Sequence, residues 1–316
     1  MKLILRMNIK YFIILILLVI PITIKSQSFE KDFIIKKNQV PYLFNEFNSY
    51  TNHDETFMLF NSNLNPNNIG GYSDLNDVWL RVKNNNIWEI PINLSEINTT
   101  DNDLLLGVDK DYFYILRENK VITYSFKEPF DLISEEIIIG FENNFDIISG
   151  SINSQNNVIF LSFQGFGTFG VEDIYYSKKT LDSWSRLVSS GSSINSSYQE
   201  LSPYLLSNDT LLFVSNSMND GYNLYYSVSK NNSFSDWSEP IKLEKLNTYN
   251  SEYSISQNLN KTSFLVSYSK DSKTNYDIYE YKHKKNNNSL ILTLNFKNDL
   301  NSGIIEISSK YSFYAN

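Results

Sequence analysis

The sequence predicts an all-β protein, specifically a β-propeller built from four-stranded antiparallel blades, and three observations point to it. Aromatic residues make up 15% of the chain, with 22 Tyr and 21 Phe against 4 Met, and flat rings suit the pleated surface of strands. A repeat of about fifty residues recurs along the chain. The most apolar segment of a repeat, such as TLLFVSN at 210–216, lacks a polar face, as expected where each sheet is covered on both sides.

Two independent markers define the repeat. A polar residue before an aliphatic and an aromatic residue occurs at Asp77, Asp173, Asn223 and Asp277, with steps of 96, 50 and 54 residues. A tryptophan occurs at Trp88, Trp184 and Trp237, with steps of 96 and 53 residues. Because 96 is close to two steps, a degenerate copy is expected between them, and the segments YFYIL at 112–116 and VITYS at 121–125 fill it. We interpret the seven marker residues as structural repeat positions.

The repeats extend over residues 45–285 as five units, each with four predicted strands separated by Asn, Asp and Gly turns. The segment FIIKKNQVPYLFN at 34–46 resembles the stretch that closes a unit, so we expect residues 27–44 to supply the outer strand of the last blade and close the ring. Residues 286–316 contain two further strand-like runs, which are either last-blade strands or the start of a truncated β-domain. On this basis we expect six blades in preference to five.

The N-terminus predicts export. Lys2, Arg6 and Lys10 precede an apolar stretch at 11–24, and Ser26-Gln27 offers a cleavage site. This stretch is too short to span a bilayer core of about 30 Å, so we interpret residues 1–26 as a removed signal peptide; an uncleaved anchor is the alternative. We predict a protein of the periplasm, associated with the outer membrane or secreted, with no direct membrane insertion after cleavage.

Charge and cysteine content exclude several classes of function. The formal charge is −8, and it falls to −12 without the leader, which carries four basic residues and no acid. An acidic chain that keeps only three arginines is a poor nucleic-acid binder. The chain contains no cysteine, so it has neither disulfides nor a cysteine for an N-terminal lipid anchor.

Several repeat segments resemble the WD-like repeats of TolB-type propellers, especially those in periplasmic OmpA-family proteins of Bacteroidetes-like bacteria. The matching segments are ELSP at 200–203, LFVS at 212–215, DIYYS at 173–177, WSEP at 237–240 and LNT at 246–248. The resemblance covers most of residues 45–285 and is weakest in the second unit. It implies a scaffold that binds envelope proteins or glycans without catalysis. Many relatives continue into a carboxypeptidase-regulatory-like domain and an OmpA-like domain, and since this chain ends before either, we expect the propeller to be the functional unit.

The segment GFGTFG at 165–170 matches the glycine pattern of dinucleotide and kinase phosphate loops. Such a loop needs a helix after its glycines, so that the helix N-terminus can face the phosphates. The following residues, VEDIYYS, instead predict a strand. We interpret the segment as a hairpin between two strands of a blade and expect no cofactor.

The enzymatic alternative, a glycoside hydrolase, depends on the placement of carboxylates. The Asp or Asn markers recur in four of the five units, as turn residues do, whereas a catalytic residue is needed once. Glu200 and Glu252 begin their units, near the axis of a propeller, where a glycoside hydrolase could use one as acid and another as nucleophile or base. They are also repeat equivalents. Convergence of carboxylates that are not equivalent at one mouth of the central channel would favour the enzyme.

The sequence contains few residues suited to other kinds of catalytic or metal site. The two histidines, His53 and His283, lie in Asn- and Lys-rich loops, so neither a zinc site nor a Ser-His-Asp triad is expected. The three arginines lie on different parts of their units, which disfavours a sialidase. Asp109 to Asp111 and Asp74 to Asp77 could supply oxygen ligands to calcium, and solvated turns explain the same residues.

The sequence therefore predicts an exported, non-catalytic propeller that binds an envelope protein or a polysaccharide, with no catalytic, cofactor-binding or metal-binding residue assigned. A glycoside hydrolase with a propeller fold is the alternative.

Overall fold

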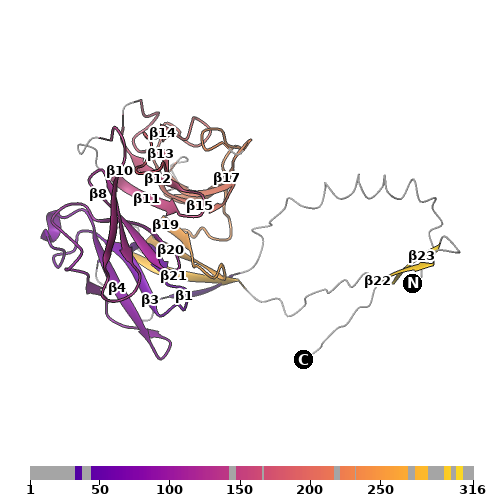
Figure 1. The fold of residues 1–316 in the computed structure, drawn as a ribbon, viewed down its shortest axis with the longest axis horizontal. Coiled ribbons are helices and arrows are strands. Elements are labelled where there is room, and N and C mark those ends of the chain that lie inside the picture. The colour runs from indigo at the N-terminus through magenta and orange to yellow at the C-terminus, as the bar shows by residue number, and fades with distance from the viewer. Residues whose placement is uncertain are drawn as a thin grey trace. The chain divides into compact units, whose positions relative to one another are not determined.

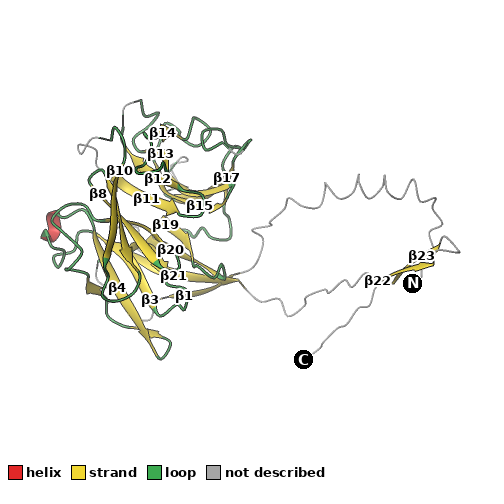
Figure 2. Cartoon of the chain, viewed as in Figure 1, coloured by secondary structure: helices red, strands yellow, loops and turns green. Residues whose placement is uncertain are grey.

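A computed structural model describes residues 33–37, 44–141, 147–165, 167–216, 221–231, 233–269, 275–283, 295–299 and 304–308. Contacts divide the chain into two units, residues 32–283 and the terminal segments 1–31 with 284–316. The predicted signal peptide at 1–26 lies outside the described residues. Among the described residues, no helix is long and apolar enough to cross a membrane. The short 3-10 turn Gly71–Ser73 stands out in Figure 2 against strands and loops.

Residues 32–283 form a β-propeller of antiparallel sheets (Figure 1). Blade 1 contains β2 (Phe47–Thr51), β3 (Phe57–Ser62), β4 (Asp77–Asn84), β5 (Ile87–Trp88) and β6 (Ile92–Asn93). Blade 2 contains β7 (Leu104–Val108), β8 (Tyr112–Arg117), β9 (Lys120–Ser125) and β10 (Leu132–Ile137). Blade 3 contains β11 (Ile147–Asn153), β12 (Val158–Phe163), β13 (Asp173–Lys178) and β14 (Val188–Ser189). Blade 4 contains β15 (Glu200–Ser207), β16 (Thr210–Ser215), β17 (Asn223–Val228) and β18 (Ile241–Lys242).

The propeller has five blades, so the expectation of six was wrong. Blade 5 consists of β19 (Ser251–Gln257), β20 (Ser263–Ser269), β21 (Tyr276–His283) and, as its fourth strand, the N-terminal β1 (Phe33–Lys37). The strand-like runs near the C-terminus form the hairpin β22 (Asn295–Asp299) and β23 (Ile304–Ser308). Within the described part of the chain these two strands pair only with each other. Their sequence has the local pattern of blade strands, but this pattern does not determine which sheet a strand joins.

The innermost strands β2, β7, β11, β15 and β19 contact one another in ring order and return to β2. Each contains a register shift of the bulge type, where its pairing with the second strand is interrupted. Across the closure of the ring, the Asn48 amide donates to Ser254 Oγ at 3.1 Å, and elsewhere the Ser202 amide donates to Ser149 Oγ at 2.7 Å. These four residues are all buried. The ring is therefore held together by hydrogen bonds between innermost strands at this level.

The third strands show the fifty-residue repeat in their register. Trp88 lies opposite Lys83, Trp184 opposite Lys179 and Trp237 opposite Ser229. Each of these partners stands six residues after a marker residue, Asp77, Asp173 or Asn223. The hydrophobic core lies between the blades: Phe160 of blade 3 packs with Phe213 and Trp237 of blade 4 in one cluster. The Trp237 indole is fully buried, and its Nε1 donates to the Phe234 carbonyl at 2.9 Å.

Candidate functional site

The four polar marker residues lie in four different blades, and each is bonded within its own blade. Asp173 at the start of β13 accepts the amides of Phe169 at 2.9 Å and Gly170 at 3.4 Å. Asp77 opens β4, Asn223 opens β17, and Asp277 is the second residue of β21. Burial raises the pKa of Asp173. In this geometry the carboxylate of Asp173 caps the loop before its strand.

The glycine-rich segment at 165–170 belongs to the loop that Asp173 caps; its Phe166 lies outside the described residues. The strand β13 follows this loop, and no helix N-terminus is present at this place. Gly170 lies so close to the neighbouring chain that a Cβ atom there would come within 2.0 Å of the Tyr198 carbonyl oxygen. The glycine at this position is therefore required by packing and not by a phosphate.

The acids that begin the innermost strands share one structural role. Glu200 accepts the Ser196 amide at 2.9 Å and the Ser196 hydroxyl at 2.6 Å, and Glu252 accepts the same two groups of Thr248 at 2.7 and 2.6 Å. Asp103 accepts the Thr99 amide at 2.6 Å in blade 2. All three side chains are buried. They hold the connection between successive blades, and their burial makes them poor candidates for acid and nucleophile on a polymer.

An asparagine precedes each of these loops and completes the connection. Its side-chain oxygen accepts the backbone amide of the third strand, and its side-chain nitrogen donates to the carbonyl of the same residue. The pairs are Asn98 with Val78, Asn195 with Ile174 and Asn247 with Leu224, with distances between 2.6 and 3.0 Å. These asparagines recur at the repeat spacing, so the sequence contained the signal for them, although the sequence analysis did not assign it.

Two of the three arginines bind buried acids. Arg81 Nη2 bonds Glu46 Oε1, and neither side chain is more than 2% exposed. Arg117 Nε bonds Asp103 Oδ1 at 2.5 Å, and its Nη2 donates to the Ile97 carbonyl at 2.6 Å. Each arginine therefore serves its own acid, and the two do not form a shared clamp for a substrate carboxylate.

The residues proposed for metal chemistry separate into different environments. Asp109 Oδ1 accepts the amides of Asp111 and Tyr112, and its Oδ2 accepts the Tyr114 hydroxyl at 2.5 Å, so this acidic loop is a closed turn. His53 lies beside Asp54 in an exposed turn. The side chain of His283 is outside the described set. In the part of the chain that the structure describes, no group of three or more His, Asp or Glu residues could hold a metal ion.

Glu252 is the acid with the clearest consequence for stability. Its Oε2 atom is buried and has no hydrogen-bond donor among the described residues, whereas both oxygens of Glu200 are bonded. Burial raises the pKa of Glu252 to about 7 from the usual 4.5. Because the folded protein favours the protonated form, the stabilisation from this group is complete below pH 4.5. It is lost as the pH rises through 7.

We expect Glu252→Gln to flatten the pH dependence of stability. The glutamine is neutral at every pH and keeps the acceptor for Thr248, so at pH 8 this variant should exceed the parent by up to about 3 kcal/mol in free energy of unfolding. Near pH 4.5 the two should be similar. Urea unfolding at both pH values, with the exposed Glu244→Gln as the control, measures this effect. If the parent protein is equally stable at both pH values, burial does not disfavour the charged form of Glu252, and the expectation is wrong.

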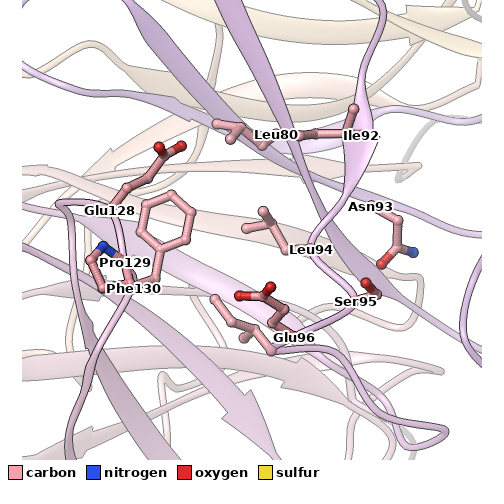
Figure 3. A pocket seen from close by; sticks show the side chains of 10 residues that line it. Leu80, Ile92, Asn93, Leu94, Ser95, Glu96, Glu128, Pro129 and Phe130 are labelled. Atoms are coloured by element: carbon pink, nitrogen blue, oxygen red, sulfur yellow. The ribbon is translucent and has the colours of Figure 1, made fainter.

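A pocket of about 440 Å³ opens between blades 1 and 2. Figure 3 shows its lining side chains, which come from β4, from β6 and the loop that follows it, and from the loop between β9 and β10. Leu80, Leu94 and Phe130 form an apolar wall. The Phe130 ring packs edge-on against the Phe113 ring, with 5.6 Å between the ring centres. This volume is within the usual range of about 300–1,000 Å³ for small-molecule sites.

Two exposed carboxylates, Glu96 and Glu128, line this pocket from different segments (Figure 3). Neither is a repeat residue. The loops equivalent to Leu94–Asn98 have Ser193 and Lys245 at the position of Glu96. Glu128 precedes β10, the six-residue outer strand of blade 2. The outer strands of blades 3 and 4 have only two residues each, so the outer part of blade 2 differs from theirs. The structure thus places two carboxylates that each occur once in the lining of one pocket, which lies between blades 1 and 2 and has no lining residue from the innermost strands.

No protein-family model matches the chain, and no curated protein does. Among solved structures, the chain resembles an alpha-L-arabinofuranosidase from Lactobacillus brevis, with 10% identity over 86% of this chain and 96% of that chain and a TM-score of 0.43. It also resembles an alpha-L-arabinanase from Penicillium chrysogenum complexed with arabinobiose, with 9% identity over 78% and 84% and a TM-score of 0.42. A third is a family AA12 carbohydrate-active enzyme from Trichoderma reesei, with 14% identity over 76% and 77% and a TM-score of 0.43.

These resembling structures are enzymes, and the sequence-based expectation of a non-catalytic scaffold is corrected on that finding. The alternative, a propeller glycoside hydrolase, is taken up as a proposal. Identities and scores at this level carry no argument about substrate or catalytic residues. The proposal that follows therefore rests on the pocket.

Proposed function

We propose that the chain is a glycoside hydrolase whose sugar site is the pocket between blades 1 and 2. The observation that carries the proposal is the presence of two non-repeated carboxylates, Glu96 and Glu128, at the edge of one partly apolar pocket. Asp173, Glu200 and Glu252 hold loops, and Glu46 and Asp103 pair with arginines; the acids at the innermost strands are buried.

The residue types suit glycosidic-bond hydrolysis. One carboxyl group protonates the leaving oxygen, and a second carboxylate acts as nucleophile or activates water. Glu96 and Glu128 supply this pair. The Phe130 ring, with Leu80 and Leu94, offers an apolar wall to the C–H face of a sugar, and the Ser95 hydroxyl can bond a sugar hydroxyl.

We further propose that the substrate is a polysaccharide outside the cytoplasm. The basic and apolar leader at 1–26 supports export, as a sequence feature. The TolB-type pattern of the repeats supports a location in the periplasm or at the outer membrane. The acidic body of the chain disfavours polyanionic substrates, so neutral polysaccharides are the class to test first.

The test uses the chain without residues 1–26 and a panel of neutral polysaccharides that includes arabinan. We expect new reducing ends from at least one of them. Glu96→Gln and Glu128→Gln should each lower the rate at least about 100-fold, because general acid–base groups contribute about 10²–10⁴-fold. The substitutions remove a charge at exposed positions, so melting temperatures should stay close to that of the parent.

Glu239→Gln, an exposed glutamate of blade 4, is the matched control and should retain full activity. Turnover that survives in both pocket variants would place the reaction elsewhere on the molecule. Absence of turnover across neutral, acidic and aryl-glycoside substrates would overturn the enzymatic proposal.

A further inference from the structure

The turn at residues 94–98 carries Glu96 and is closed by its own backbone. The amides of Ile97 and Asn98 both donate to the Leu94 carbonyl at 2.9 Å. Glu96 is exposed and lines the pocket, whereas Ile97 is buried. The direction of the Glu96 side chain therefore depends on what fixes this turn against the blades.

Arg117 of β8 binds the turn from blade 2. Its Nη2 donates to the Ile97 carbonyl at 2.6 Å, and its Nε bonds Asp103 Oδ1 at 2.5 Å. The Arg117 side chain is 18% exposed, and that of Asp103 is fully buried. A guanidinium carries its donors in one rigid plane, so it can hold a carbonyl and a carboxylate at the same time. Arg117 thus fastens the residue that follows Glu96 to blade 2.

The connection between two blades does not itself require an arginine at this place. The connections that lead to blades 4 and 5 form the same closed turn, in which two amides donate to the carbonyl of Gly191 or Leu243. The residues opposite their acids are Ser215 and Tyr268, which have no guanidinium. Arg117 is therefore an addition in blade 2, at the one of these three turns that lines the pocket.

The strand β8 also supports the other wall of the pocket. Side chains alternate along a strand, so Phe113 and Arg117 lie on the same face of β8. The Phe113 ring packs edge-on against the Phe130 ring, with 5.6 Å between the ring centres. Phe130 and Glu128 belong to one segment of the pocket lining. One strand therefore supports both the turn of Glu96 and the segment of Glu128.

We propose that Arg117 is a positioning residue for the reaction, which directs Glu96 toward a sugar that lies on Phe130. This inference rests on the proposed function of the pocket. Arg117 acts through the Ile97 carbonyl and needs no contact with the sugar. Displacement of a reacting group by about 1 Å can lower a rate about 100-fold, so the chemistry requires the turn to be fixed.

The variant Arg117→Lys separates the two bonds of the guanidinium. A lysine ammonium keeps a positive charge beside Asp103, but it lacks the planar fork that also reaches the Ile97 carbonyl. Hydrogen exchange of the Ile97 and Asn98 amides should become at least about 10-fold faster in this variant. This measurement needs no substrate, so it tests the attachment of the turn independently of any activity.

Kinetics test the positioning role on a polysaccharide that the parent cleaves. Arg117→Lys should lower kcat about 10- to 100-fold and change KM less than about 3-fold, because Phe130 still holds the sugar. In a Glu96→Gln background the same substitution should leave the residual rate nearly unchanged, whereas in a Glu128→Gln background it should have its full effect. A role in stability alone would lower the rate equally in both backgrounds.

Glu200→Ala is the matched control, because it removes the acceptor of the Ser196 amide in the equivalent connection of blade 4. It should lower the melting temperature and leave kcat unchanged. Unchanged exchange at Ile97 and Asn98 in Arg117→Lys would overturn the inference whatever the activity. An active parent whose kcat survives Arg117→Lys would overturn it and leave the proposed function standing. A parent that cleaves no glycoside would overturn the proposed function and the positioning role together.

Discussion

Removal of residues 27–37 is expected to destabilise the propeller by about 5 kcal/mol or more, enough to abolish a cooperative transition in a protein of ordinary stability. The deletion takes away β1, which pairs with β21 over five residues from Phe33↔His283 to Lys37↔Tyr279. It also removes the Phe33 ring from its edge-on contacts with Phe264 at 6.1 Å and Tyr281 at 6.2 Å. Blade 5 would keep three strands, with β21 as an unpaired edge.

The matched control removes residues 289–316, which include β22 and β23. Because these strands pair only with each other among the residues that the structure describes, thermal unfolding should keep its midpoint within about 1 °C. Calorimetry of both deletions separates five blades from six. If the C-terminal deletion unfolds the ring and the N-terminal one leaves it intact, the closure assigned to β1 is wrong.

Replacement of Arg81 by Met is expected to lower the free energy of unfolding by about 3–5 kcal/mol. The guanidinium of Arg81 is fully buried against the Glu46 carboxylate and lies 5.5 Å from the centre of the Phe60 ring. The substitution leaves the Glu46 charge in the interior next to the first innermost strand. Urea unfolding at pH 7 measures the loss.

The surface pair Lys120 and Glu135 provides the comparison. Their nitrogen–oxygen distance is 2.9 Å, and both side chains are more than 40% exposed, so Lys120→Met should leave the free energy of unfolding close to that of the parent. Glu46→Gln in the Arg81→Met background should recover part of the stability, because it removes the unpaired charge. Equal effects of the two methionine substitutions would mean that Arg81 is solvated in solution.

The local pattern of a blade could be predicted from the sequence because each strand is defined by its own residues. The spacing of Asp77, Asp173 and Asn223 corresponds to strands that start at those residues, and the tryptophans lie at one register position. The number of blades depends on which strands pair. The runs in 286–316 have the same composition as blade strands, and pairing over long sequence distances has no local signature.

The candidate site was missed for a related reason. Glu200 and Glu252 became candidates because they recur at the repeat spacing. Structural acids recur in the same way, and both carboxylates are buried and accept hydrogen bonds from loop amides. Glu96 and Glu128 are 32 residues apart in the sequence, in neighbouring blades, and belong to no motif. A signal for Glu96 existed in its departure from the repeat, where the equivalent loops have serine or lysine. Nothing in the sequence around Glu128 indicates that it faces the same pocket.

The most direct test of the central claim is a crystal structure of the Glu128→Gln variant soaked with a short oligosaccharide of the polysaccharide that the parent cleaves. We expect sugar density in the pocket between blades 1 and 2, against Phe130, with Glu96 and position 128 beside the glycosidic oxygen. Density at the ring axis or on another face, with this pocket free of sugar, would contradict it.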